Sequence, residues 1–195
     1  VVEVPRDTPR GALLLRGATA LTMRGDEAVV DADLLVVDDR IAAVGKRGSV
    51  AVPDGATVLD VSGRYLIPGL IDTHTHIADI RRDVLDLESW GPLANLAYGV
   101  TTVFDPSTLS IDTLAYQDLV EAGRMPGARI FSTGPAIFSF NEFTSYEQVR
   151  DVLRRHRGHY RLGNIKMYRT GNRRVRQWVA MAARETGLMP TTEGA

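Results

Sequence analysis

Cysteine is absent from the 195 residues of this sequence. The chain can therefore form no disulfide, offer no thiolate nucleophile and bind no zinc through cysteine sulfur. Any metal ion must be bound by histidine, carboxylate or modified lysine. No apolar run approaches the roughly 18 residues of a membrane-spanning helix, and the first residues show no signal-peptide pattern. No membrane role is expected, and the compartment stays open. The glycine-rich motifs of dinucleotide and nucleoside-triphosphate sites and the G-x-S-x-G motif of serine hydrolases are missing as well.

Charge is nearly balanced overall, with a net charge of −1, but it is unevenly placed. Residues 1–149 carry 12 Lys and Arg against 21 Asp and Glu, whereas residues 150–176 carry 10 against one. The basic stretch lacks interleaved aromatics and a recognised nucleic-acid module, so nucleic acid is disfavoured relative to a charge match with the acidic N-terminal part, a partner surface or an anionic substrate. His156 and His159 lie within it at a helical spacing, but the surrounding arginines oppose a bound cation. We expect both histidines on a solvated surface.

Residues 1–65 are predicted to form a small antiparallel β unit. Short strand-like runs are separated by glycine, aspartate and proline signals, and Asp38-Asp39-Arg40 is typical of a hairpin turn between two of them. The expected strands are residues 12–15, 18–22, 33–37, 41–44 and 57–61.

Residues 66–195 alternate strand, loop and helix at intervals of roughly 25 to 35 residues, as successive βα units require. Helices are indicated by an apolar stripe from Val175 to Ala183 and by a capping box in which Ser145 and Gln148 precede an apolar face. The pattern predicts an α/β fold. The expected strands are 66–76, 101–105, 129–133, 164–168 and 188–193, with helices near 93–97, 114–120, 145–158 and 175–183.

The apolar run that begins at Leu66 predicts a buried strand, and it ends in two histidines, His74 and His76, two residues apart. Alternate residues on a strand share one face, so these imidazoles, about 6.6 Å apart along the strand, can converge on one ion. Such a pair on an arbitrary strand is more often solvent-facing or hydrogen-bonded. Here it follows Pro68-Gly69 at the C-terminal end of a strand, where parallel α/β folds place their chemistry.

The segment Pro68-Gly69-Leu70-Ile71-Asp72-Thr73-His74-Thr75-His76 resembles the first barrel strand of the amidohydrolase superfamily of metal-dependent hydrolases. The resemblance implies that residues 1–65 are part of a small β-sandwich and that residues 66–195 are about the first five strands of a TIM-like (β/α)8 barrel. It also implies one or two divalent ions, with zinc expected, and hydrolysis of amide or cyclic-amide C–N bonds of a small molecule by metal-activated water.

Lys166 lies between Ile165 and Met167 on an apolar strand. Burial of an ammonium at such a position is unfavourable in free energy unless the group is paired, chemically altered or at the strand end. By the resemblance, Lys166 matches a fourth-strand lysine that carbon dioxide can carboxylate, which makes a carbamate that bridges two metal ions. The alternatives are a lysine that reaches the barrel mouth or one that pairs with an acid.

The fifth strand departs from the family pattern, because Thr191-Thr192-Glu193 stands where members supply a histidine. Glu193 is therefore a candidate oxygen ligand, with an ordinary strand-end acid as the alternative. Asp105, at the end of the second strand, is expected to be a hydrogen-bond acceptor for its loop. Gly134-Pro135, residues 168–174 and residues 189–194 further resemble amidohydrolase domains that follow a β-propeller in long bacterial proteins.

The family's sixth-strand histidine and eighth-strand aspartate have no counterpart in this sequence, so no catalytic proton shuttle is assigned. A complete eight-stranded barrel also typically needs about 250 residues. We expect the chain to hold part of a site that a C-terminal half completes. The rival hypothesis is a non-catalytic half-barrel that assembles with a second copy or another chain through the bare edges of its sheet.

Overall fold

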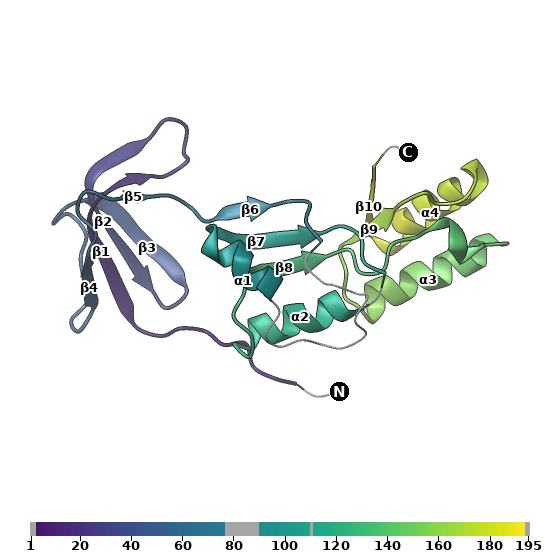
Figure 1. Ribbon diagram of the computed structural model, residues 1–195, viewed down its shortest axis with the longest axis horizontal. Coiled ribbons are helices and arrows are strands. Elements are labelled where there is room, and N and C mark those ends of the chain that lie inside the picture. The colour runs from purple at the N-terminus through teal and green to yellow at the C-terminus, as the bar shows by residue number, and fades with distance from the viewer. Residues whose placement is uncertain (1–2, 77–89, 110, 194–195) are drawn as a thin grey trace. The chain divides into compact units, whose positions relative to one another are not determined.

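The computed structural model describes residues 3–76, 90–109 and 111–193, and the chain divides into two units, Val1–Gly69 and Leu70–Ala195. The sequence pattern placed this division after residue 65. Figure 1 shows strands alone in the first unit and strands alternating with helices in the second. None of the helices in the described ranges is long and apolar enough to cross a membrane.

The N-terminal unit is one five-stranded sheet in the order β3-β2-β1-β4, with β5 also paired to β1. As predicted, β1 pairs antiparallel with β2, and β2 with β3 across the turn at Asp38-Asp39. The prediction of an all-antiparallel unit is wrong, because β4 and β5 run parallel to β1. The chain crosses from the β3 edge to the β1 edge, and such a long connection allows parallel pairing, unlike a hairpin. The strands are β1 (Ala12–Leu21), β2 (Ala28–Val37), β3 (Arg40–Lys46), β4 (Thr57–Asp60) and β5 (Tyr65–Leu66).

A fully buried carboxylate, that of Asp33, anchors this sheet. Arg16 donates to it from Nε at 3.1 Å and from Nη2 at 3.2 Å, and the amide of Gly48 donates at 2.9 Å. The hydrogen bonds from the Arg16 guanidinium hold the pKa of Asp33 below its usual range, because they favour the ionised carboxylate. The pair therefore ties β1 and β2 to the turn that follows β3. The sandwich implied by the family resemblance stays a prediction.

Within its described residues, the C-terminal unit contains five parallel strands. A three-stranded sheet runs β6-β7-β8, and a two-stranded sheet pairs β9 with β10. Ile137, just after β8, joins the two sheets, because its amide donates to Lys166 at 2.8 Å and its carbonyl accepts from Tyr168 at 3.1 Å. The strands thus follow one another in chain order, as βα units predict. They are β6 (Leu70–Asp72), β7 (Val100–Asp105), β8 (Arg129–Ser132), β9 (Asn164–Met167) and β10 (Met189–Thr192).

The helices between these strands lie within about three residues of the predicted ranges. The Ser145 hydroxyl accepts from the amide of Gln148 at 3.3 Å, although the Gln148 side chain bonds to Thr144 instead of closing the capping box. Asn172 caps the last helix by accepting from Val175 at 3.1 Å, and Gly187 ends it in a left-handed conformation, which glycine adopts without strain. The helices are α1 (Trp90–Ala97), α2 (Asp112–Glu121), α3 (Tyr146–Gly158) and α4 (Arg173–Thr186), with a 3-10 turn at Ser139–Asn141.

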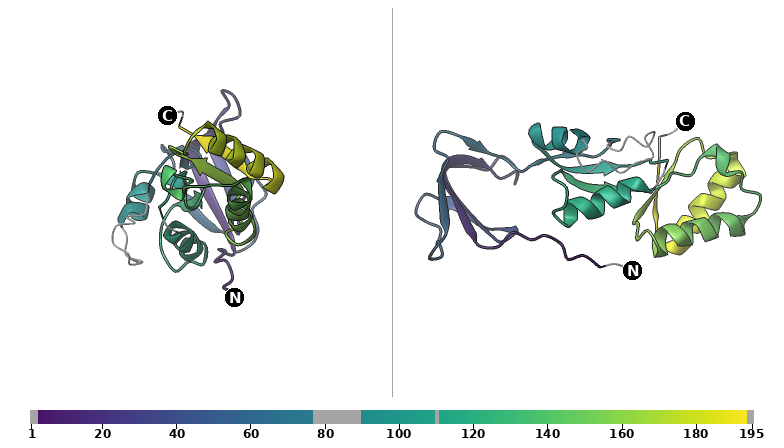
Figure 2. Two further views of the ribbon diagram at one scale, coloured as in Figure 1. Left: turned by 90° about the vertical axis from the view of Figure 1, so that its right-hand side faces the viewer. Right: turned by 60° about the horizontal axis from the view of Figure 1, so that its bottom comes forward.

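Two separate hydrophobic clusters fill the C-terminal unit. We call them the β7–β8 core and the α3–α4 core. The helices α3 and α4 lie side by side (Figures 1 and 2), and the predicted stripe on α4 is buried beneath them. The β7–β8 core contains Val103, Tyr116, Met125, Ala128 and Ile130, and the α3–α4 core contains Ile137, Val149, Leu153, Leu162, Ile165, Val175, Val179, Ala182, Ala183 and Leu188.

Replacing Leu153 with alanine should lower the free energy of unfolding by about 2–5 kcal/mol, because the side chain is fully buried and its removal leaves a cavity. Chemical denaturation monitored by circular dichroism measures the change. The matched control is Arg154→Ala on the exposed face of the same helix, which should change stability by no more than about 0.5 kcal/mol. Equal effects of the two substitutions would contradict the assigned packing of α3.

Candidate metal centre

The two spaced histidines follow β6 instead of lying within it, because the strand ends at Asp72. The Asp72 carboxylate accepts from the amide of His74 at 3.0 Å, and the amide of Thr75 donates to Phe104 of β7 at 3.1 Å. These bonds hold the segment at the C-terminal end of the sheet. The rings of His74 and His76 lie 5.5 Å apart, edge to face, and are about half exposed.

The expectation of a buried first strand is wrong, since Leu70 and Ile71 are 51% and 65% exposed. The reason is the place of β6 at the edge of its sheet, where only β7 pairs with it among the described strands. Burial of this edge needs a further layer or strand. The apolar residues of this segment therefore indicate that it packs against a further layer or strand, although these residues are exposed in this chain.

His76 is oriented by a buried acid. Its Nδ1 lies 3.0 Å from Oδ1 of Asp105, which is 2% exposed at the end of β7 and also accepts from the amide of Ser107 at 3.2 Å. With Nδ1 donating, Nε2 of His76 keeps its lone pair for another partner. A histidine held through one ring nitrogen by a carboxylate is typical of metal ligands. Asp105 is thus the loop acceptor that the sequence predicted, but its contact with His76 was missed.

Lys166, Glu193 and His74 meet at one oxygen atom. Nζ of Lys166 donates to Oε1 of Glu193 at 2.8 Å, and Nε2 of His74 lies 3.0 Å from the same oxygen. Lys166 is 2% exposed on β9, whereas Glu193 directly follows β10. The hydrogen bond from Lys166, helped by its charge and by the two histidines, holds the pKa of Glu193 below its usual range. Glu193 is therefore an ionised acceptor at neutral pH.

The contact between His74 and Glu193 joins the two ends of the row of strands. His74 follows β6, the first strand of the row, and Glu193 follows β10, the last, yet their side chains are within 3.0 Å. The C-terminal ends of β6 and β10 must therefore curve toward each other. The four residues singled out from the sequence, His74, His76, Lys166 and Glu193, are linked at these strand ends, through the Glu193 oxygen and the contact between the two histidine rings.

The candidate donor atoms are of the chemical types that bind divalent ions. Imidazole nitrogens and carboxylate oxygens are ligands for zinc and related ions, and His76 is presented as such a ligand by Asp105. Within the described ranges, however, no three His, Asp or Glu side chains gather closely enough to hold an ion. The ammonium of Lys166, 2.8 Å from Glu193, opposes a cation at this oxygen.

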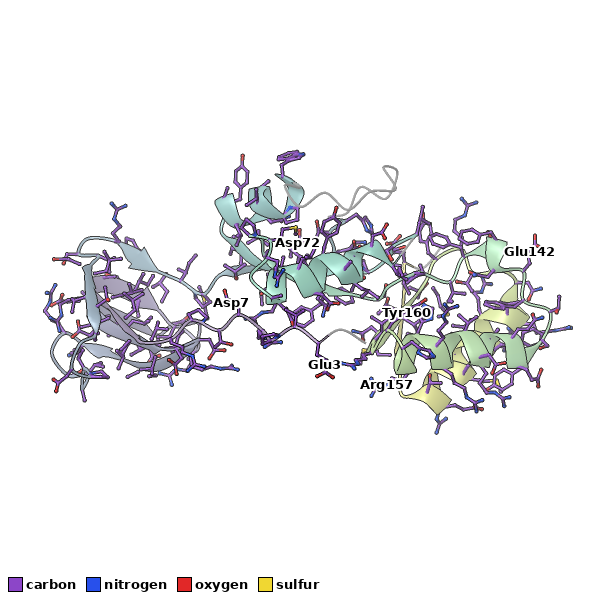
Figure 3. The ribbon with its side chains drawn as sticks, turned by 90° about the horizontal axis from the view of Figure 1, so that it is seen from below. Glu3, Asp7, Asp72, Glu142, Arg157 and Tyr160 are labelled. Atoms are coloured by element: carbon purple, nitrogen blue, oxygen red, sulfur yellow. The ribbon has the colours of Figure 1, made fainter. Side chains whose placement is uncertain are left out.

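The second histidine pair does not form a site. His159 is exposed, as expected, but His156 is only 4% exposed, so the prediction of a solvated surface is wrong for it. His156 lies on the same helical face as the buried Val149 and Leu153 and packs inward with them. The arginines at positions 154–176 are exposed, and Figure 3 marks Arg157 near the end of α3.

Sequence comparison finds relatives among enzymes of known name, although no family model matches this sequence. An adenine deaminase of Deinococcus deserti is 32% identical over 143 residues, which is 70% of this chain and 24% of that protein. A dihydroorotase of Mycobacterium tuberculosis is 39% identical over 72 residues, 37% of this chain and 16% of that protein. A 5-methylthioadenosine/S-adenosylhomocysteine deaminase of Desulforamulus reducens is 44% identical over 68 residues, 34% of this chain and 16% of that protein. The chain thus spans about a quarter or less of the length of these curated relatives.

Solved structures share the fold along nearly the whole chain. Molinate hydrolase superposes with a TM-score of 0.73 at 18% identity, covering 94% of this chain and 54% of that one. Phenylurea hydrolase B gives a TM-score of 0.71 at 22% identity, covering 94% and 55%. The D-hydantoinase of Thermus sp. gives 0.59 at 21% identity, covering 92% and 39%.

Identity above 30% to deaminases and a dihydroorotase, together with a mixed α/β fold shared with hydrolases and a hydantoinase, shows that the chain belongs to the amidohydrolase superfamily, a family built on the TIM barrel.

Proposed function

We propose that the complete protein is a metal-dependent hydrolase of amide or cyclic-amide C–N bonds, and that this chain holds part of its active site. The observation that carries the proposal is the convergence of His74 and Lys166 on one Glu193 oxygen. It occurs at the C-terminal end of parallel strands, where TIM-barrel enzymes hold their catalytic groups. The names of the relatives, which include a dihydroorotase and deaminases, support a C–N bond as the target.

In this proposal, the five parallel strands are the first five of an eight-stranded barrel, and the N-terminal sheet is part of a small sandwich. His74 and His76 would hold one divalent ion, with zinc expected, and carboxylated Lys166 would be a ligand to this ion and to a second one, with Glu193 as a further candidate oxygen ligand. When bound, the ion supplies the Lewis acid that makes water a nucleophile at neutral pH. Asp105 keeps His76 in the tautomer that can bind, through its contact with Nδ1.

Replacing His74 or His76 with alanine should abolish metal retention by the complete protein, since each removes an imidazole ligand. Asp105→Asn should weaken metal affinity by about 10–100-fold, because it removes the carboxylate that orients His76. Elemental analysis after dialysis against a weak chelator measures both effects. The control is His159→Ala, which lies outside the site. Unchanged metal content in the His74 and His76 variants would refute the assignment.

Lys166 is expected to be carboxylated only when metal is bound. A carbamate beside Glu193 places two anions together, and a cation between them removes this repulsion. Carbon-13 NMR with labelled bicarbonate should show one carbamate signal in the metal-loaded protein, and none in the metal-free protein or in Lys166→Arg. An active metal-loaded enzyme without this signal would mean that Lys166 acts as the ammonium partner of Glu193.

Residues 1–195 alone should not hydrolyse substrate, because no proton shuttle stands with the ligands in the described residues. The rival proposal, a non-catalytic half-barrel, is favoured by the exposed apolar edge of β6 and by Trp90, which is 78% exposed. Both proposals predict that the isolated chain oligomerises, aggregates or needs its missing half.

The experiment purifies residues 1–195 with zinc and bicarbonate, measures the mass in solution and screens cyclic amides and dipeptides. A monodisperse monomer with turnover that disappears in His74→Ala would overturn the claim of incompleteness. In the complete protein, a metal-free stable oligomer without turnover would favour the scaffold over the enzyme.

A further inference from the structure

Three aromatic side chains lie in a row that starts two residues after Lys166. The rings of Tyr168 and Phe138 meet edge to face with their centroids 5.6 Å apart, and the Phe138 ring stacks on the Phe140 ring at 5.0 Å. Tyr168 and Phe138 are half-buried, whereas Phe140, in the 3-10 turn, is 65% exposed. We call these three residues the aromatic row. It extends from the end of β9 to solvent.

The backbone directs the aromatic row to the side of the sheet that carries Lys166. Met167 packs against the α3–α4 core, so its neighbours Lys166 and Tyr168 face the other side, about 7 Å apart along the chain. Ile137 belongs to the same core and bridges to Met167. The next residue, the extended Phe138, therefore meets the Tyr168 ring on the side away from that core. The row thus begins beside the candidate metal centre, on the face where Lys166 reaches Glu193.

Hydrogen bonds fix the backbone on both sides of the aromatic row. Oδ1 of Asn141 accepts from the amide of Phe138 at 2.7 Å, which closes the 3-10 turn around Phe140. The amide of Tyr168 donates to the carbonyl of Ile137 at 3.1 Å, so the loops after β8 and β9 are joined. Rings that are held in this way lose little conformational freedom when they bind a ligand.

Packing of the loop does not account for the exposure of Phe140. Phe143, three residues further on, contacts the α3–α4 core and provides the loop with an apolar anchor. Phe140 is stacked on one ring and still largely exposed, so it has surface for another. Contacts between aromatic rings are favourable beyond the area that they bury. An exposed ring beside a candidate metal centre therefore fits a planar apolar ligand better than solvent.

We propose that the aromatic row is a substrate subsite that binds a planar aromatic group of the amide substrate, beside the bond to be hydrolysed. This subsite rests on the proposed function, because it takes the candidate metal centre as the place of hydrolysis. Tyr168 is the ring nearest to Lys166 along the chain, and Phe140 is the outer ring. The substrates expected are amides with an aromatic side group, in preference to amides with a small aliphatic one.

The subsite is tested by the binding of two uncharged amides that differ only in a phenyl ring, N-acetylphenylalaninamide and N-acetylalaninamide. Isothermal titration calorimetry on the metal-free complete protein measures both affinities without turnover. The phenyl compound should bind about 10-fold more tightly, because its ring gains contacts with the aromatic row. Equal affinities, or no binding of the phenyl compound, would overturn the proposal.

Substitution of the outer ring tests which residue provides this preference. Phe140→Ala should lower the preference for the phenyl compound by about 3-fold or more, because one ring contact is lost, whereas Phe140→Trp should keep it. The matched control is Tyr98→Ala, since Tyr98 is 84% exposed and precedes β7 at the opposite end of the strands. Nuclear Overhauser effects between the probe's phenyl protons and labelled phenylalanine rings give a second measurement on the unaltered protein. An unchanged preference in Phe140→Ala would refute the role of Phe140.

Failure of the subsite and failure of the proposed hydrolase give different results. Hydrolysis of both amides by the metal-loaded protein with equal kcat/KM would refute the subsite and leave the hydrolase standing. A preference for the phenyl compound that Phe140→Ala lowers, without hydrolysis of either amide, would support the aromatic subsite and count against the hydrolase.

Discussion

A charged amine on an apolar strand must be matched by an anion, because an unpaired buried ammonium is far less stable than a solvated one. Lys166 imposes this requirement on the C-terminal unit, and Glu193 meets it. The pairing of β10 with β9 places Thr192 opposite Met167, so that Glu193 emerges just beyond the strand end. The same carboxylate then receives His74 from the far edge of the sheet. This one charge therefore connects the β9–β10 pair, through Glu193, with His74 at the far edge.

The sequence predicted the C-terminal unit well because its signals are local. Capping by Ser145 and the apolar stripe of α4 each act within a turn or two of helix. The N-terminal sheet was predicted less well. Whether a strand joins one edge of a sheet or the other depends on contacts distant in sequence, and nothing in residues 57–66 records that β4 and β5 lie parallel to β1.

The same distinction applies to the candidate site. His74, His76, Lys166 and Glu193 could be found individually, from spacing, from a charge on an apolar strand and from a family resemblance. The contact between His76 and Asp105 depends on two neighbouring strands ending together, which the βα pattern could have suggested. The burial of His156 was also within reach, since it continues the period of Val149 and Leu153. The arginines around it obscured that period.

The two hydrophobic cores of the C-terminal unit are separate, and the candidate ligands belong to different sides of the boundary between them. His76 is held by Asp105 at the end of β7, next to the first core, whereas Lys166 directly follows Ile165 of the second. The two cores can separate along this boundary while each core stays packed, because separation breaks only the contacts that cross the boundary. A metal ion bound by residues from both sides holds the two cores together. Its apparent affinity is reduced in proportion to the fraction of molecules in which the cores are separated. Stronger contacts across the boundary therefore raise that affinity without a change in any metal-binding atom.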